Sequence, residues 1–217
     1  MVVATPQNMA ACNSLLVAAG LTLSSDTLTQ LCENAERVIA VDGGLKQLRS
    51  IDCNPQYLIG DLDSCNQDDL TWATENGAQI FQIDNQENTD LTKAISFCEN
   101  EGWLDLHIVG IEGGRIDHFL GGAAAMHSAS KSLKIGASFS TCELVRLANL
   151  ETQVFPFYGT FSVFCFGNSI ISLTGSNWEL ENEMIDFTTR GISNQATGWV
   201  ELTLHEGDPI FILFNHQ

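Results

Sequence analysis

The sequence is poor in basic residues, with 9 Lys and Arg against 27 Asp and Glu among 217 residues, a formal net charge of −18. Proteins that bind nucleic acid through its phosphates need a basic surface, and an anionic membrane repels a chain of this charge. We therefore expect neither nucleic acid nor a membrane as a partner. If the chain binds ATP, a metal ion must supply most of the compensating charge.

Several common motifs are also absent. The sequence has no Gly-x-x-x-x-Gly-Lys-Ser/Thr phosphate loop and no Gly-x-Gly-x-x-Gly dinucleotide fingerprint. Its seven cysteines form no Cys-x-x-Cys pair and have no histidine at zinc spacing, which is typical of reduced thiols. No apolar run approaches the roughly 20 residues of a membrane span. Residues 1–12 lack the basic start and apolar core of a signal peptide, so we expect a cytoplasmic protein.

The first two thirds of the chain alternate between short apolar runs and helix-like stretches. This alternation predicts parallel βαβ units. The expected strands are 15–19, 38–41, 57–59, 79–83 and 106–111. The expected helices are 24–35, 45–49, 68–75, 91–100 and 119–130.

Beyond about residue 140 the helical pattern stops, and short strands punctuated by glycines predict an antiparallel β-sandwich. We therefore predict a three-layer α/β domain with a parallel sheet over residues 1–135, followed by an all-β antiparallel sandwich domain over residues 136–217. The boundary is expected within residues 132–141. The strands expected in the second domain are 143–147, 153–157, 162–165, 169–173, 184–187, 200–204 and 209–214.

The most informative segment is Ile-Gly-Asp-Leu-Asp-Ser at residues 59–64, where two carboxylates follow a short apolar strand. If the chain stays extended there, Asp61 and Asp63 point to the same side. Converging carboxylates repel each other unless a cation lies between them, and Mg²⁺ is typically held by one or two carboxylates and substrate phosphates. The segment therefore indicates metal-dependent phosphate chemistry, with an ordinary turn as the alternative.

Acidic residues follow successive predicted strands throughout the first domain: Asp42, Asp61, Asp63, Asp90 and Asp117. The carboxyl ends of parallel strands share one edge of the sheet, and ligands bind in the crevice outside that edge. We therefore expect these carboxylates to line one acidic crevice.

Two glycine pairs lie in the same loops, at residues 43–44 and 113–114. Glycine permits the close backbone approach that a nucleotide phosphate needs, although each pair taken alone is more typical of a tight turn. Arg115 directly follows the second pair, and His118 is notable among the histidines only because it follows Asp117 in this loop.

The order of these motifs resembles the thiamine pyrophosphokinase family. The resemblance covers roughly residues 38 to 214. The matching segments are Val-Asp-Gly-Gly at 41–44, Ile-Gly-Asp-Leu-Asp-Ser at 59–64, Gln-Glu-Asn-Thr-Asp at 86–90, Gly-Gly-Arg-Ile-Asp-His at 113–118, Leu-Thr-Gly-Ser-Asn-Trp-Glu-Leu at 173–180 and Arg-Gly-Ile-Ser-Asn at 190–194.

The resemblance implies a homodimer with active sites between its subunits. It implies transfer of a pyrophosphoryl group from ATP to the hydroxyethyl oxygen of thiamine, giving thiamine diphosphate and AMP. With Mg²⁺ on the ATP phosphates, the hydroxyl would attack the β-phosphorus in line.

The resemblance and the residue types together imply roles for individual side chains. Asp61, Asp63 and Asp90 would hold Mg²⁺ and carry catalysis, and Asp61 or Asp90 would accept the hydroxyl proton. Arg115 would bind phosphate as a fork, and Trp178 would stack on the cationic thiamine rings. The other implied residues are Asp42, Gly43, Gly44, Gln86, Asp117 and His118 for ATP, and Ser193 and Asn194 for thiamine.

Some roles have structural alternatives, and the sequence departs from the family pattern in two places. Asp117 would otherwise cap the following helix, and Trp178 would otherwise belong to the core of the second domain. Asn85 stands where the family has an aspartate, and Leu45 where a small residue often follows the glycine pair.

Three other functions remain open at this point. The chain could be a Mg²⁺-dependent pyrophosphokinase for another alcohol, a catalytically silent thiamine- or nucleotide-binding protein, or a structural acidic interaction module. Asn85 is the feature that favours a silent binder.

Overall fold

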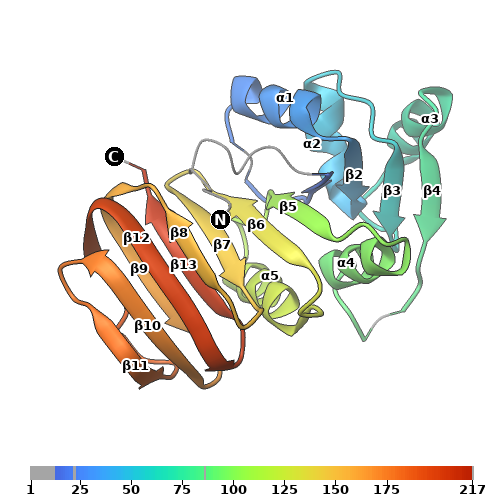
Figure 1. Cartoon of the computed structure of the whole chain (residues 1–217). Coiled ribbons are helices and arrows are strands. Elements are labelled where there is room, and N and C mark those ends of the chain that lie inside the picture. Colours follow the sequence, from blue (N-terminus) through green and yellow to red (C-terminus); the bar gives the residue numbers. More distant parts are fainter. Residues whose placement is uncertain (1–12, 22, 86, 217) are drawn as a thin grey trace. The chain divides into compact units, whose positions relative to one another are not determined.

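The computed structural model describes residues 13–21, 23–85 and 87–216, which form two compact units that join at residues 140 and 141 (Figure 1). The predicted fold class is confirmed: along the chain, a parallel α/β unit comes first and an antiparallel β unit follows. The predicted division between residues 135 and 136 would fall inside the strand Lys134–Ser138.

The first unit is built on a parallel sheet with the strand order β6-β5-β1-β2-β3-β4. Strand β6, which the sequence pattern did not indicate, pairs in register with β5. The strands are β1 (Ser14–Val17), β2 (Arg37–Val41), β3 (Tyr57–Gly60), β4 (Gln79–Gln82), β5 (Asp105–Val109) and β6 (Lys134–Ser138). The helices are α1 (Ser25–Asn34), α2 (Leu45–Ser50), α3 (Gln67–Glu75), α4 (Asp90–Asn100) and α5 (Ile116–Ser128), and a short 3-10 turn, η1 (Asp42–Gly44), precedes α2.

Helices cover both faces of this sheet. Helices α1, α2 and α3 lie on one face, where Leu31 and Leu48 pack with Leu15, Val38 and Leu58 (Figure 1). Helices α4 and α5 lie on the other face and contact each other. Local capping fixes where several helices begin. The caps are Ser24, which accepts the Thr27 N–H, Asn66 in a capping box with Asp69, and Thr89, which accepts the Thr92 N–H.

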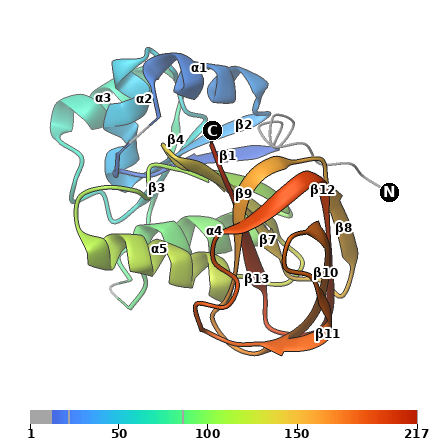
Figure 2. The same cartoon turned by 90° about the vertical axis from the view of Figure 1, so that its left-hand side faces the viewer.

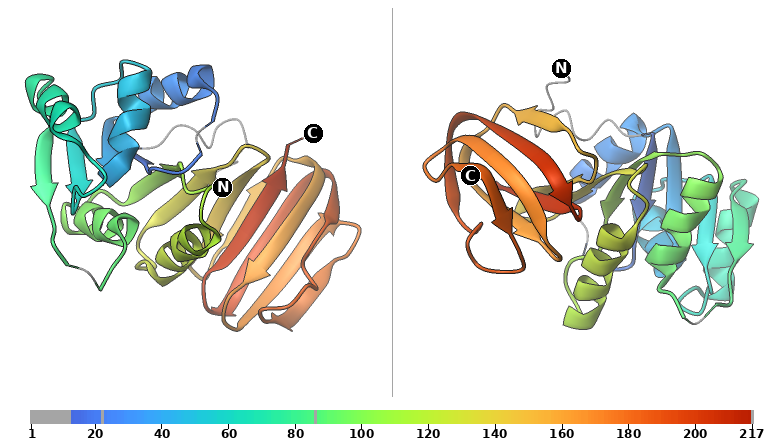
Figure 3. Two further views of the ribbon diagram at one scale, coloured as in Figure 1. Left: turned by 180° about the vertical axis from the view of Figure 1, so that it is seen from behind. Right: turned by 60° about the horizontal axis from the view of Figure 1, so that its bottom comes forward.

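The second unit is an antiparallel sheet that folds over a common apolar core (Figures 2 and 3). Its strand order is β11-β10-β12-β9-β13-β7, and β8 pairs with β12. The core contains Phe155, Phe161 and Phe214, which are almost completely buried. The strands are β7 (Cys142–Leu147), β8 (Thr152–Phe155), β9 (Tyr158–Cys165), β10 (Ser169–Ser176), β11 (Leu180–Ile185), β12 (Asn194–Gly207) and β13 (Ile210–Asn215).

Two strands of this unit differ from the sequence-based expectation. Strand β12 is 14 residues long, whereas the pattern indicated only residues 200–204, because its polar, glycine-containing first half has no apolar alternation. That first half pairs with β9, and the second half pairs with β8. Strand β11 begins at Leu180, whereas the pattern indicated a start at residue 184. Its first residues are largely exposed and polar, so they lack the apolar pattern by which a strand is recognised.

The described cysteines form no disulfide. No helix in the described ranges is long and apolar enough to cross a membrane.

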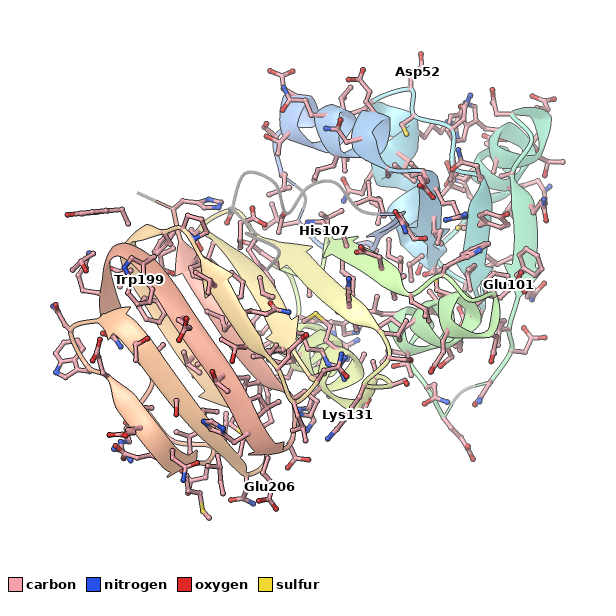
Figure 4. The ribbon with its side chains drawn as sticks, viewed as in Figure 1. Asp52, Glu101, His107, Lys131, Trp199 and Glu206 are labelled. Atoms are coloured by element: carbon pink, nitrogen blue, oxygen red, sulfur yellow. The ribbon has the colours of Figure 1, made fainter. Side chains whose placement is uncertain are left out.

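A buried polar pair joins the last two strands of the parallel sheet. His107 on β5 is 1% exposed, and its Nε2 lies 2.7 Å from the Ser138 Oγ on β6 (Figure 4). Burial lowers the pKa of His107 from the ordinary 6.5 to about 4, because the imidazolium form would lose its hydration. The folded protein therefore holds His107 neutral at pH values where the unfolded chain protonates it.

This difference predicts a pH-dependent contribution to stability. It is fully present above the unfolded pKa near 6.5 and is lost as the pH falls toward 4, because the unfolded state binds about one more proton there. His107→Gln keeps a hydrogen-bonding group but cannot titrate, so its free energy of unfolding should fall less between pH 7 and pH 4.5. Urea unfolding at both pH values measures the difference. Equal losses in the variant and the natural protein would contradict a neutral buried His107.

Candidate active site

A pocket of about 610 Å³ lies at the carboxyl edge of the parallel sheet. Strands β1 and β5 are neighbours there, but the chain leaves β1 toward β2 and β5 toward β6. This edge is therefore a topological switch point, the usual ligand site of an open α/β sheet. Four of the five carboxylates expected in one acidic crevice, Asp42, Asp63, Asp90 and Asp117, line this pocket, whereas Asp61 is not among its lining residues.

Two glycines that the sequence analysis did not single out shape the pocket at the switch point. A Cβ on Gly20 would lie 2.5 Å from the Gly110 carbonyl oxygen, and a Cβ on Gly110 would lie 2.3 Å from the Ala18 carbonyl oxygen. The Gly20 N–H donates to the Gly110 oxygen at 2.6 Å. Only glycine allows these loops to meet so closely, and the available signal was a glycine just beyond each strand.

Asp42 follows β2 in a left-handed conformation, with φ of 45°, and is buried. The glycine pair after it packs against the sheet, because a Cβ on Gly44 would lie 1.8 Å from the Val17 carbonyl oxygen. Gly60, at the end of β3, leaves room for Asp42, since a Cβ there would approach the Asp42 Cβ to 2.9 Å. Gly43 and Gly44 thus have a packing role, whether or not they also approach a nucleotide.

Three carboxylates converge beside this pocket. Asp42, Asp61 and Asp90 each offer an oxygen, and these atoms lie within 4.8 Å of one another. The predicted metal ligands were Asp61, Asp63 and Asp90. Asp63 lies in the same pocket, but its carboxylate is not part of this cluster.

The backbone between the two aspartates explains the place of Asp63. The chain does not stay extended here, because Leu62 has a φ of 69°, and the alternative of a turn is the one found. The Asp63 N–H donates to the Asp61 Oδ1 at 3.3 Å, and the Asp63 Oδ1 accepts the Ser64 hydroxyl at 3.0 Å. A turn therefore replaces the strand geometry that would have paired the two carboxylates.

Lys93 lies among these carboxylates and was missed by the sequence analysis. Its Nζ is 2.8 Å from the Asp90 Oδ1 and 3.4 Å from the Asp61 Oδ2, and its side chain is 3% exposed. Burial alone would favour the neutral amine, but the neighbouring carboxylates of Asp90 and Asp61 outweigh it and raise the pKa of Lys93. A lysine three residues after an aspartate at a helix start was the available signal.

The donor set fits a hard divalent cation. Carboxylate oxygens are the ligands that Mg²⁺ prefers, and it usually completes its shell with water and substrate phosphates. Asp42, Asp61 and Asp90 carry three negative charges, and Lys93 offsets one of them. A divalent ion here would neutralise the remaining charge.

The loop after β5 supplies the pocket's exposed cation. Arg115 forms a fork with Asp117, with its Nε 3.1 Å from Oδ1 and its Nη2 2.5 Å from Oδ2. This fork holds the pKa of Asp117 at about 2. The N-cap of α5 is Arg115, so Asp117 is not the cap but lies in the first turn. Gly113 and Gly114 precede it with φ of 78° and 68°, and His118 also lines the pocket.

The loop between β4 and α4 contains the departure at residue 85. Gln86 lies outside the described residues. The Asn85 Oδ1 accepts the Glu87 N–H at 2.7 Å, and the exposed Asp84 accepts the Gln82 side-chain amide at 3.0 Å. Among the residues that the structure describes, Asp84 is not in the carboxylate cluster.

The second unit has its own pocket, of about 410 Å³, lined by residues that include Trp178, Glu179, Asp186, Arg190 and Asn194. Trp178 is 63% exposed, so it is not a core residue of this unit. Arg190 is paired with Glu183 on β11. Trp178 thus offers an exposed indole in a pocket that Glu179 and Asp186 also line, an arrangement that suits an aromatic cation.

Asn194 organises the segment that carries Trp178. Its Nδ2 donates to the Trp178 carbonyl oxygen at 2.8 Å and to the Ser176 Oγ at 3.1 Å. Its Oδ1 accepts the N–H groups of Trp178 and Gln195. The side chain is therefore fully engaged within the protein. The neighbouring Ser193 is exposed, has a φ of 60° and donates its N–H to the Ser162 Oγ.

The family comparison agrees with these motifs. Residues 28–136, about half of the chain, match the family model described as "Thiamin pyrophosphokinase, catalytic domain". The matched range contains the three clustered carboxylates, Lys93 and the Gly113–Arg115 loop. The sequence matches none of the curated proteins.

Solved structures with similar folds cover both units. A thiamine pyrophosphokinase from Bacillus subtilis is 22% identical, with a TM-score of 0.78 over 94% of this chain and 100% of that one. The enzyme from Candida albicans is 16% identical, with a TM-score of 0.80 over 98% and 92%. The yeast enzyme is 14% identical, with a TM-score of 0.77 over 98% and 90%. At these identities the likeness shows a shared fold.

The two possible ligand sets make different predictions for metal binding. If the cluster holds the ion, Asp42→Asn should weaken Mn²⁺ binding about tenfold or more, because one charged ligand is lost. Asp63→Asn should then change the affinity much less. Isothermal titration of each variant with MnCl₂ measures both values, with the exposed Asp84→Asn as the control. A larger loss in Asp63→Asn would instead favour Asp61, Asp63 and Asp90 as the ligands.

Proposed function

Because the chain belongs to the thiamine pyrophosphokinase family, we propose that it transfers a pyrophosphoryl group from ATP to thiamine, giving thiamine diphosphate and AMP. The observation that carries the proposal is the carboxylate cluster at the switch point, beside a glycine loop and a helix N-terminus. This combination suits a metal-bound polyphosphate.

We assign the phosphate side of the reaction to the first unit. Asp42, Asp61 and Asp90 would hold Mg²⁺, and Asp63 stays a candidate ligand at the edge of the pocket. When bound, the ion would offset the charge that develops as the thiamine hydroxyl displaces AMP at the β-phosphorus.

The residues around the cluster would bind and orient the polyphosphate. Arg115 would exchange its Asp117 partner for phosphate oxygens, because the same fork fits both anions. The N-terminus of α5 presents backbone N–H groups and a positive dipole end to the same pocket. We keep Gln86 and His118 as further ATP-binding candidates.

Asp61 or Asp90 would accept the hydroxyl proton. Both carboxylates contact Lys93, and most of the rate enhancement is expected from positioning and charge stabilisation.

We assign thiamine to the pocket of the second unit. Trp178 would stack on the cationic rings, and the acidic residues Glu179 and Asp186 would add electrostatic attraction. Asn194 would act by fixing the Trp178 segment, and Ser193 would offer its hydroxyl to the ligand. The transfer requires both substrates in one active site, which we propose forms between the subunits of a homodimer.

The reaction itself is tested by product analysis. With ATP, Mg²⁺ and thiamine, the protein should form AMP and thiamine diphosphate in equal amounts, and Asp61→Asn should abolish both. Chromatography of the nucleotides and thiamine esters measures this. Thiamine-dependent formation of ADP instead of AMP would indicate transfer of a single phosphoryl group and would exclude pyrophosphoryl transfer. Thiamine binding without any product would favour the silent binder that Asn85 suggests.

The thiamine site is tested by kinetics. Trp178→Ala should raise the KM for thiamine about tenfold or more, because stacking and cation–π attraction are lost, and should leave the KM for ATP nearly unchanged. Trp199→Ala is the control, since Trp199 is also exposed on this unit but does not line the pocket (Figure 4). Equal rises in both KM values would show that Trp178 supports the fold instead.

A further inference from the structure

Lys93 is the buried basic group of the candidate active site. It lies one turn into α4, and its side chain is 3% exposed. Within the described part of the chain, it is the one basic residue that forms ion pairs with the carboxylate cluster, through Asp61 and Asp90. A lysine is rarely buried unless its charge is paired, so its place calls for a specific role.

Two of the protein's own donors meet at a single oxygen of Asp90. The Asp90 Oδ1 accepts both the Lys93 ammonium at 2.8 Å and the Asp61 N–H at 3.0 Å. In the described residues, no protein hydrogen bond is directed at the Asp90 Oδ2. The arrangement therefore fixes the orientation of Asp90 while leaving one oxygen for another ligand.

The charges of the cluster also indicate a role for Lys93. Three carboxylates with oxygens within 4.8 Å repel strongly when they are partly removed from water. Asp42 is buried and Asp61 and Asp90 are partly buried, so solvent screens them incompletely. Without Lys93, a metal-free site would have to hold three adjacent negative charges with no basic partner.

We propose that Lys93 is a positioning residue that serves as a built-in counter-charge, holding Asp61 and Asp90 in place before a divalent cation binds. The proposal rests on the metal use in the proposed function. It implies that the site stays ordered without metal, and that Lys93 lowers the cation affinity in exchange. The bound ion then remains available to the polyphosphate instead of being held by the protein alone.

The test measures stability and metal binding without ATP or thiamine. In EDTA, Lys93→Met should lower the Tm by about 5 °C or more, because the carboxylates lose their partner. Saturating Mg²⁺ should restore most of this loss, and the affinity for Mn²⁺ should rise about tenfold. Lys134→Met is the matched control, because Lys134 is an exposed lysine near Asp105 at the amino end of β6. It should change neither value.

A charge-compensated variant keeps the test decisive if Lys93→Met does not fold. Asp90→Asn combined with Lys93→Met removes one charge of each sign, so it should recover most of the metal-free Tm. Recovery supports the counter-charge. A double variant as unstable as the single one, or an equal loss of Tm with and without Mg²⁺, would overturn the proposal and leave Lys93 as a packing residue. Unchanged or weaker Mn²⁺ binding in a folded Lys93→Met protein would also overturn it.

These outcomes are separable from the fate of the proposed reaction. A protein that forms no AMP can still show the Lys93 effects on Tm and Mn²⁺ affinity. That result would reject the proposed reaction and support the counter-charge role of Lys93. Normal thiamine diphosphate synthesis by the natural protein, together with an equal loss of Tm in Lys93→Met with and without Mg²⁺, would support the proposed reaction and reject the counter-charge role.

Discussion

The mutual repulsion of three adjacent carboxylates is the constraint that the first unit must satisfy. Asp42, Asp61 and Asp90 follow three different strands, β2, β3 and β4. A left-handed turn and the space left by Gly60 place Asp42, whereas Asp90 is held by the Asp61 N–H and by Lys93. The sheet supplies the rigid edge on which these loops converge, so the fold provides the energy that keeps like charges together.

In a chain with a net charge of −18, the two units are suited to ligands of opposite charge. A polyphosphate can approach the acidic first unit only if cations intervene, and the carboxylate cluster, Lys93 and Arg115 are arranged to supply or recruit them. A cationic ring system needs no such help in the second unit, where Trp178 lies beside Glu179 and Asp186. In the proposed reaction, the excess of acid would favour thiamine directly and ATP through a metal ion.

The asparagine at position 85 takes part in a local turn, and the three clustered carboxylates come from other positions. The cluster is completed by Asp42, from another loop, and does not require a carboxylate at position 85. The Asn85 side-chain oxygen accepts the Glu87 N–H, a turn-forming bond that asparagine and aspartate make equally well. The substitution is thus compatible with the local loop shape that leads to the Thr89 cap and Asp90.

The sequence by itself determined the class of each unit and which segments carry the candidate site residues. Apolar periodicity is a local property, so the strands before Asp42 and Asp61 and the helix after Asp90 were predictable from neighbouring residues. The antiparallel pattern after residue 140 was predictable for the same reason, apart from the polar first half of β12.

Tertiary structure decided which carboxylates meet and what lies between them. The left-handed Leu62 turned Asp63 away from the cluster, and Asp42 took the third place because β2 and β3 are neighbours in the sheet. The sequence pattern did not distinguish Lys93 from the other residues of its helix. The fold buries it against Asp61, which lies 32 positions earlier in the chain. Such contacts depend on backbone turns and strand order, which bring together residues that do not influence each other locally, and no pattern within a single segment records them.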